Sequence, residues 1–566
     1  MLKGTGVSSG IGIGRALLVE ECSLEYTPKT VTDTAEEIKR FQSAVDIFCE
    51  NTEKKAEALK ISAGVEEAEI IQGHIGIVKD PFLLGEVGKR ITEGQCAEAA
   101  FESMCDMLIG IFSSADDDVT QQRGADVRDV KSGVLSILLG VNQVNLSEMP
   151  PETVLCAKEL TPSMMAEINK EQIVGIVTET GSTTSHSAIL ARVLEIPAVM
   201  SVPDVMKAVK NGDTVIVDGS KGDMIVSPDH AQAESYTVRR KKLLEERREL
   251  EQFRGKATLS ADGTVYELVC NIGRPDDAKK AMESDGEGVG LFRTEFLFMD
   301  KRSVPTEKEQ FEAYQKAALI LKGKPLVIRT LDIGGDKEIA CLGMAKEDNP
   351  FMGCRAIRYC LKNRDLFRTQ LRAILRASAF GNVSIMFPLI TCVEEVREGK
   401  ALVEEIKAEL KAEKIDFDEN IKVGIMAETA AAGVTADLLA KECDFFSIGT
   451  NDLTGYTMAA DRGNGEVSYL YSALQPSVLR MIRNIIEAAG KQHIPVGMCG
   501  EAAADPLMIP LLISFGLTEF SVSAPSVLRV RKYISGWTKE KADEITAKVM
   551  SLSTRQEISD YLKTVI

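Results

Sequence analysis

Eight short apolar runs succeed one another along residues 258–566, and amphipathic helical stretches separate most of them. The runs read ELVCNIG, GVGLFRT, LVIRTLDIG, VSIMFPLI, VGIMAET, FFSIGTND, PVGMCGE and EFSVS. Strands that alternate with helices are typical of parallel sheets, because each helix carries the chain back to the start of the next strand. Eight such units over about 300 residues predict a (β/α)8 TIM barrel.

The residues before the barrel fall into four further patterns. Residues 21–142 place apolar side chains at helical spacing, whereas residues 143–229 alternate short apolar runs with helical stretches and predict a small α/β domain. Residues 1–20 read as a glycine-punctuated strand with no strand partner in the helical stretch. We therefore expect this strand to join the α/β domain, with the all-helical stretch inserted. Residues 230–257, with RRKKLLEERRELE at their centre, predict a solvated linker helix.

The glycines of residues 1–20 do not make a nucleotide-binding loop. Neither G-x-G-x-x-G nor G-x-x-x-x-G-K-[ST] is present there or at the later GGDK. Turns beside a strand are the simpler interpretation of SSGIGIG.

Charge and composition exclude several classes of protein. A net charge of -18 argues against nucleic acid as a substrate and suits a partner with a basic surface. The sequence contains no run of 18 apolar residues and begins without a signal-peptide pattern, so we expect neither a membrane span nor secretion. The 12 cysteines are scattered without CxxC pairs, as expected of reduced thiols in a cytoplasmic protein.

Charged and polar side chains gather where the predicted barrel strands end, which is the rim at which TIM barrels perform chemistry. Guanidinium groups suit phosphate and carboxylate, because they donate two parallel hydrogen bonds and stay charged. Two carboxylates with a substrate phosphate are a common Mg²⁺ site. The alternative is that these charges pair only with each other on a solvated rim. The residues concerned are Arg293, Arg329, Arg355, Glu428, Asn451, Asp452, Arg462 and Cys499.

Two residues are candidates for chemistry on a substrate. Cys499 ends the seventh run, and a thiol, being mostly protonated near neutral pH, could give a proton to an anionic enolate. His186 lies in GSTTSHSAILAR, where glycine and hydroxyl residues precede an apolar helical run. A histidine at a helix start could carry a phosphoryl group, since the helix terminus stabilises an anion. Taken alone, the motif favours a surface histidine near a helix cap over a phosphoryl carrier, and only the context of the other residues reverses that preference.

Together these residues resemble enzyme I of the bacterial phosphoenolpyruvate:sugar phosphotransferase system, over essentially the whole chain. GSTTSHSAILAR is similar to the phosphohistidine motif of that family. The motifs GLFRTEFLFM, VIRTLDIGGDKE, DNPFMGCRAIR, FFSIGTNDLT, AADRGN and GMCGEAAAD are similar to its barrel motifs and follow the same order. AEIIQGHIGIVKDP and RGADVRDV resemble the helical subdomain that docks the phosphocarrier protein HPr. His74 lies in that stretch and either packs within the fold or contacts the carrier.

The resemblance implies a phosphoenolpyruvate-protein phosphotransferase. Phosphoenolpyruvate and Mg²⁺ would bind at the barrel mouth, His186 would take the phosphoryl group, and Cys499 would help protonate the pyruvate enolate. The phosphohistidine domain would then pass the group to a histidine of HPr, as the first step of sugar uptake, in a homodimer formed through the barrel. By motif position, Glu428 and Asp452 would bind Mg²⁺. The substrate would be bound by Arg293, Arg329, Lys337, Arg355, Asn451 and Arg462.

Several positions depart from the family pattern without removing a charge from this chemistry. They are Met165, Ser182, Cys354, Gly455, Gln475, Ala502 and Ala504. These departures support one alternative, a diverged or non-catalytic regulator that senses phosphoenolpyruvate. A dikinase-like or synthase-like enzyme is the nearest rival, but we expect it to carry a nucleotide-binding module where only residues 1–20 precede the helical insert. A nitrogen-system paralogue would need an added sensory domain.

Overall fold

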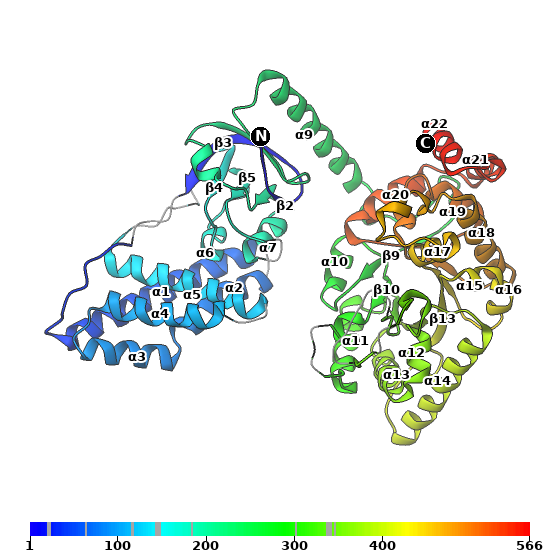
Figure 1. Ribbon diagram of the computed structural model, residues 1–566, viewed down its shortest axis with the longest axis horizontal. Coiled ribbons are helices and arrows are strands. Elements are labelled where there is room, and N and C mark those ends of the chain that lie inside the picture. The colour runs from blue at the N-terminus through cyan, green and yellow to red at the C-terminus, as the bar shows by residue number, and fades with distance from the viewer. Residues whose placement is uncertain are drawn as a thin grey trace. The chain divides into compact units, whose positions relative to one another are not determined.

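The chain forms two compact units, Met1–Arg247 and Arg248–Ile566 (Figure 1). The boundary between them falls inside helix α9 (His230–Glu251), where the sequence predicts a linker helix. The computed structural model describes residues 1–19, 24–62, 65–114, 118–141, 146, 149–182, 185–299, 301, 303–334, 342–344 and 347–566.

The first unit contains an eight-stranded sheet in the order β1-β8-β7-β3-β4-β5-β6-β2. Strand β3 pairs in parallel with β4 and antiparallel with β7, so it lies in the middle of the sheet, whereas β1 and β2 form the two edges. The prediction of one strand in residues 1–20 was incomplete, because the described part of this segment forms three strands. The strands are β1 (Leu2–Lys3), β2 (Thr5–Ser8), β3 (Ile11–Val19), β4 (Thr153–Ala157), β5 (Ile173–Thr178), β6 (Ala198–Met200), β7 (Thr214–Asp218) and β8 (Asp223–Val226).

Glycines in β3 serve close packing of the backbone. A Cβ atom at Gly12 would collide with the carbonyl oxygen of Val174, and one at Gly14 with that of Glu152. Only a residue without a side chain allows this approach. The glycine pattern of the N-terminal segment therefore reflects how β3 fits into the sheet.

Five helices form an all-helical part between β3 and β4. Aromatic side chains such as Phe41 and Phe101 meet in its core, with ring centroids 5.6 Å apart, and Val130 packs in the same cluster. These helices are α1 (Thr34–Ser62), α2 (Val65–Val78), α3 (Pro81–Thr92), α4 (Ala97–Ser113) and α5 (Asp118–Leu139). Three shorter helices accompany the sheet: α6 (Pro162–Met165), α7 (His186–Val193) and α8 (Val205–Ala208).

The second unit is a closed barrel of eight parallel strands, which confirms the predicted TIM barrel (Figure 1). Each predicted run contains one strand. The runs extend beyond their strands, most clearly at LVIRTLDIG, where the strand ends at Arg329, and at FFSIGTND, where a helix begins at Thr450. The strands are β9 (Glu267–Ile272), β10 (Val289–Arg293), β11 (Leu326–Arg329), β12 (Val383–Phe387), β13 (Lys422–Ala427), β14 (Phe446–Ile448), β15 (Val496–Met498) and β16 (Glu519–Val522).

Helices follow the barrel strands, and their apolar faces pack with the strands in one large core. The helices are α10 (Asp277–Glu283), α11 (Glu307–Leu321), α12 (Ile357–Lys362), α13 (Arg364–Ser378), α14 (Val393–Glu413), α15 (Ala430–Val434), α16 (Ala436–Leu439), α17 (Thr450–Met458), α18 (Pro476–Lys491), α19 (Ile509–Phe515), α20 (Val527–Ser535), α21 (Lys539–Ser551) and α22 (Arg555–Val565).

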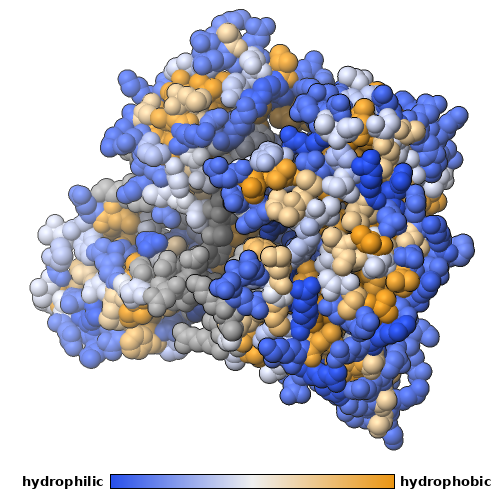
Figure 2. All heavy atoms as spheres, turned by 45° about the vertical axis from the view of Figure 1, so that its right-hand side comes forward, coloured by the Kyte–Doolittle hydropathy of each residue, from blue (hydrophilic) through white to orange (hydrophobic). Residues whose placement is uncertain are grey.

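The face of the molecule drawn in Figure 2 is mainly hydrophilic. Figure 2 shows polar side chains over most of the visible face, with apolar side chains in scattered groups. Within the described ranges, no helix has both the length and the apolar content needed to cross a bilayer.

Candidate active site

The residues predicted for the rim lie at the carboxyl ends of the barrel strands. Arg293 ends β10 and Arg329 ends β11. Glu428 directly follows β13, and Cys499 directly follows β15. Asp452 stands in the first turn of α17, after β14. Because all eight strands are parallel, these positions share one mouth of the barrel.

A buried chain of alternating charges joins two of the arginines. Arg329 Nη1 lies 3.1 Å from Asp332 Oδ2, and Arg355 Nη2 donates to Asp332 Oδ1 at 3.0 Å. Arg329 also donates to Glu295. On the other side, Arg355 Nη1 lies 3.3 Å from Asp452 Oδ1. Asp332 thus holds two guanidinium groups side by side inside the protein.

Both arginines keep a hydrogen-bond donor free for a ligand. Arg329 and Arg355 are each only 6% exposed, yet within the described residues neither Nε–H group has an acceptor. Leaving a buried donor unpaired is costly, so such groups in a native protein indicate a missing partner. Although burial opposes their charged forms, neighbouring carboxylates raise the pKa of both guanidinium groups, which stay cationic. The arrangement suits an anionic ligand.

Glu428 makes the same mouth suitable for a cation. Its side chain is 1% exposed, and the amide N–H of Leu389 donates to its Oε1 at 2.7 Å. Burial, and then the carboxylates of Asp452 and Asp332, raise the pKa of Glu428 well above its usual value. A divalent cation would neutralise the negative charge of these neighbouring carboxylates. Two hard oxygen donors, Glu428 and Asp452, therefore fit Mg²⁺ that completes its shell with water and substrate.

Backbone strain occurs beside these residues. Leu389, which donates to Glu428, has φ +55°, and Ala356, which follows Arg355, has φ +53°. Residues other than glycine adopt this left-handed conformation at a cost of about 1–3 kcal/mol, and such positions concentrate at functional sites. The strain directs the Leu389 amide toward the carboxylate.

Cys499 is a protonated thiol in the barrel interior. It is 5% exposed, and its Sγ lies 3.6 Å from the carbonyl oxygen of Ile448. Burial raises the pKa of Cys499 to about 11, and Glu428 adds to the shift, while Ser447 and nearby arginines oppose it. The thiol therefore retains its proton at neutral pH, as a general acid must.

The remaining predicted rim residues are less constrained by contacts. Arg293 and Arg462 are exposed, and in the described part of the chain no hydrogen bond or ion pair of either is found. Asn451 is half-buried, and its carbonyl oxygen accepts from the Tyr471 hydroxyl at 2.8 Å. Lys337 lies outside the described residues. Arg293 and Arg462 can thus reorient toward a ligand at the mouth.

His186 is the first residue of α7 in the first unit. Ser185 caps this helix, and its Oγ accepts from the Ala188 amide at 3.3 Å. Ser187 donates to the carbonyl of Leu160, which anchors the helix start to the segment before α6. The predicted helix start is therefore present. Met165, one of the departures from the family pattern, is fully buried in the core of this unit.

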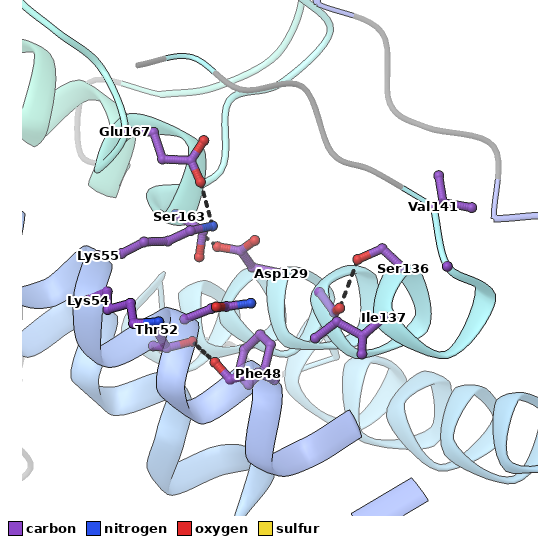
Figure 3. A pocket seen from close by; sticks show the side chains of 13 residues that line it. Phe48, Thr52, Lys54, Lys55, Asp129, Ser136, Ile137, Val141, Ser163 and Glu167 are labelled. Atoms are coloured by element: carbon purple, nitrogen blue, oxygen red, sulfur yellow. Dashed lines mark hydrogen bonds and ion pairs between the residues drawn. The ribbon is translucent and has the colours of Figure 1, made fainter. Parts of the chain in front are cut away.

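A polar cavity of about 510 Å³ lies between the helical part and the segment around α6 (Figure 3). Lys55 Nζ on α1 lies 2.7 Å from Glu167 Oε1, and the Ser163 amide donates to Asp129 Oδ2 at 3.0 Å. These contacts fasten α1 and α5 to α6, which packs against α7. His74 is fully buried nearby, with its ring nitrogens 3.6 Å from Asp126 and 3.8 Å from Asp129.

Sequence reasoning missed Asp332, Glu295 and Tyr456. Asp332 and Glu295 lie within LDIGG and RTEF, three and two residues after predicted arginines, respectively, so an acidic residue near each arginine was the available signal. Tyr456 accepts from Arg355 Nη1 at 3.2 Å and donates to the Phe351 carbonyl. It therefore connects the loop of Arg355 to α17.

Comparison with known proteins agrees with this architecture. Residues 3–123, 149–222 and 247–538 match the N-terminal, mobile and PEP-binding domains of PEP-utilising enzymes, respectively. The chain is 44% identical to the phosphoenolpyruvate-protein phosphotransferase of Priestia megaterium, covering 100% of this chain and 98% of the relative. It is 45% identical to the protein of that name from Bacillus subtilis (strain 168), covering 99% of each chain.

Among solved structures, an NMR solution structure of the Enzyme I (nEIt) protein is similar, with 38% identity and a TM-score of 0.39. The match covers 43% of this chain and 99% of that one. On the full-length relatives and the matched domains, the chain belongs to the phosphoenolpyruvate-protein phosphotransferase family of PEP-utilising enzymes.

Proposed function

We propose that the chain transfers the phosphoryl group of phosphoenolpyruvate to His186 and then to a histidine of the phosphocarrier protein HPr, releasing pyruvate. This would be the first step of sugar uptake by a phosphotransferase system. The observation that supports the proposal most is the barrel mouth itself. There, two buried arginines have Nε–H donors that find no acceptor among the described residues, and they lie beside the buried carboxylate Glu428. Such a mouth suits a small anion chelated to a divalent cation.

Each residue has a distinct task in the first half of the reaction. Arg329 and Arg355 bind the phosphate and carboxylate of phosphoenolpyruvate, and the substrate site is completed by Arg293, Lys337, Asn451 and Arg462. A neutral imidazole of His186 attacks phosphorus, so that an N–P bond forms while the bond from phosphorus to the enol oxygen breaks. The enolate that departs takes a proton at carbon from the Cys499 thiol, which water then reprotonates.

Mg²⁺ fits the donor set of Glu428 and Asp452. When bound, it would neutralise charge on the phosphoryl oxygens and so favour their attack by a neutral nucleophile. The carboxylates hold it, while the arginines orient the substrate.

The second half of the reaction takes place away from the barrel. The phosphorylated His186 faces a carrier histidine, and the phosphoryl group passes from one imidazole to the other. A net charge of -18 favours a carrier with a basic docking surface. We further propose a cytoplasmic homodimer formed through the barrel. The cysteines among the described residues are free thiols, which fits a reducing compartment.

A single-turnover assay of pyruvate tests this function. Without carrier, wild-type protein with phosphoenolpyruvate and Mg²⁺ should release one pyruvate per chain and then stop, whereas added HPr should make release continuous. His186→Ala should give no burst, and His230→Ala, a change at an exposed histidine of the same unit, should behave as wild type. Continuous release without carrier, or an unchanged burst in His186→Ala, would contradict the proposal.

A further inference from the structure

The two units are connected by an arm, which consists of helix α9 and residues 252–258. A single arginine holds the base of this arm, where it joins the barrel. Arg531 on α20 is 2% exposed and ranks among the largest fully buried side chains. Its Nε donates to Thr258 Oγ1 at 3.0 Å, and its Nη1 donates to the carbonyl of Phe253 at 3.1 Å. These two acceptors lie on the segment that runs from the end of α9 to the start of β9. One guanidinium therefore holds this segment at two points.

The same guanidinium group also binds the loop before β10. Its Nη2 donates to the Asp285 carbonyl at 2.8 Å, and its Nη1 pairs with the Asp285 carboxylate. Asp285 in turn accepts from the Gly255 amide at 2.7 Å, and the Arg254 side chain donates to the Glu283 carbonyl at 2.6 Å. The connecting segment and this loop are thus fastened to each other through several bonds.

The last turn of α9 has its own tie to α20. Lys532 Nζ lies 2.7 Å from Glu249 Oε2, two residues before the helix ends. This pair is exposed and contributes little to stability by itself. It nevertheless joins the last turn of α9, at the base of the arm, to α20, the helix that carries Arg531.

Closing a barrel does not require a buried cation. Apolar side chains of similar volume fill such positions without the desolvation cost of a guanidinium, which is several kcal/mol in proteins. In Arg531 this desolvation cost is offset by hydrogen bonds to acceptors on the arm and on the loop before β10. Because the donors of the planar guanidinium group point at defined angles, their hydrogen bonds fix the orientation of the segment that accepts them.

The place of the Arg531 contacts in the barrel makes the orientation of α9 important. Thr258 precedes β9 and Asp285 precedes β10, so the arm is rooted at the amino ends of the strands, on the face opposite the mouth. Helix α9 has 22 residues and is about 33 Å long. A change of about 10° at its base would move the far end by about 6 Å.

We propose that Arg531 is a positioning residue for the first half of the reaction, because it sets the direction in which the connecting arm leaves the barrel. The inference rests on the proposed function, in which His186 must reach the barrel mouth. Transfer between His186 and HPr does not need that visit. The two halves of the reaction therefore separate the role of Arg531 from general damage.

The test measures phosphorylation of His186 in full-length Arg531→Met from two donors, saturating phosphoenolpyruvate with Mg²⁺ and phosphorylated HPr. We expect the first rate to fall about tenfold or more, since misplacing reacting groups by an ångström or so has effects of this size. The KM for phosphoenolpyruvate and the rate from phosphorylated HPr should not change. Arg531→Lys should be intermediate, because an ammonium can still pair with Asp285.

Two controls keep the test decisive. Val530→Ala shortens a fully buried side chain of the barrel core on the same helix and should leave the ratio of the two rates unchanged. If Arg531→Met does not fold, Lys532→Glu places like charges at the end of α9 and should lower the same rate by a smaller factor. Equal slowing of both reactions, a raised KM, or the same ratio in Val530→Ala would overturn the proposal. A wild-type protein that phosphoenolpyruvate fails to phosphorylate would instead refute the proposed function.

Discussion

Replacing Asp332 by asparagine removes the negative charge that separates two buried guanidinium groups. Asp332 is 4% exposed and contacts Arg329 at 3.1 Å and Arg355 at 3.0 Å. An asparagine keeps one acceptor oxygen but turns an NH2 group toward a second donor. Each arginine retains one other carboxylate, Glu295 for Arg329 and Asp452 for Arg355.

The cost follows from the charges that are left. Breaking a buried ion pair by removing one partner costs about 3–5 kcal/mol, and the remaining carboxylates place Asp332→Asn near the lower limit, at about 3 kcal/mol. For a unit of this size, each kcal/mol lowers Tm by about 2 °C, so we expect a decrease of about 6 °C.

Differential scanning calorimetry of the full chain would measure this change. The barrel transition should move while the transition of the first unit stays in place. Glu312→Gln removes a charge from an exposed pair with Lys308, 3.7 Å away, and should shift the barrel by less than about 1 °C. An equally small shift in Asp332→Asn would refute the reasoning that Asp332 organises the two arginines.

Three further predictions concern other residues of the barrel. Burial and Glu267 raise the pKa of Glu519 to about 8 from 4.5, so the folded barrel binds more protons than the unfolded chain between these values and loses stability as pH rises through them. The Tm of Glu519→Gln minus the Tm of wild type should therefore increase from pH 4.5 to 8 and then level off. A difference in Tm that does not change with pH would contradict this prediction. Cys499→Ala should slow phosphorylation by phosphoenolpyruvate about a hundredfold or more, and transfer to HPr hardly at all. Equal slowing would deny the thiol a role in proton transfer. Glu428→Gln should raise the Mg²⁺ concentration needed for half-maximal phosphorylation, and an unchanged requirement would exclude it as a ligand.

The barrel could be predicted from the sequence because each strand is a short apolar run with a helix after it. The predicted runs were too long where polar residues continue an apolar stretch, as at Asn451 and Asp452, because a helix begins there at once. The three strands of the N-terminal segment could not be separated, since β1 and β2 pair with β8 and β6, which lie far along the chain.

The candidate site was predictable in its charged residues but not in its pairing. Arg329 and Arg355 were found from their residue type and position, whereas Asp332 joins them through contacts that depend on how a distant loop folds back. Leu389 was also beyond reach, because its role lies in a backbone amide and a left-handed φ. Sequence patterns do not encode such contacts.

The most direct measurement locates the phosphoryl group after one turnover with phosphoenolpyruvate and Mg²⁺. The account predicts one acid-labile, base-stable phosphate per chain, found by peptide mapping on the segment that contains His186, absent from His186→Ala and discharged by HPr. Phosphate on another residue, or full labelling of His186→Ala, would contradict it.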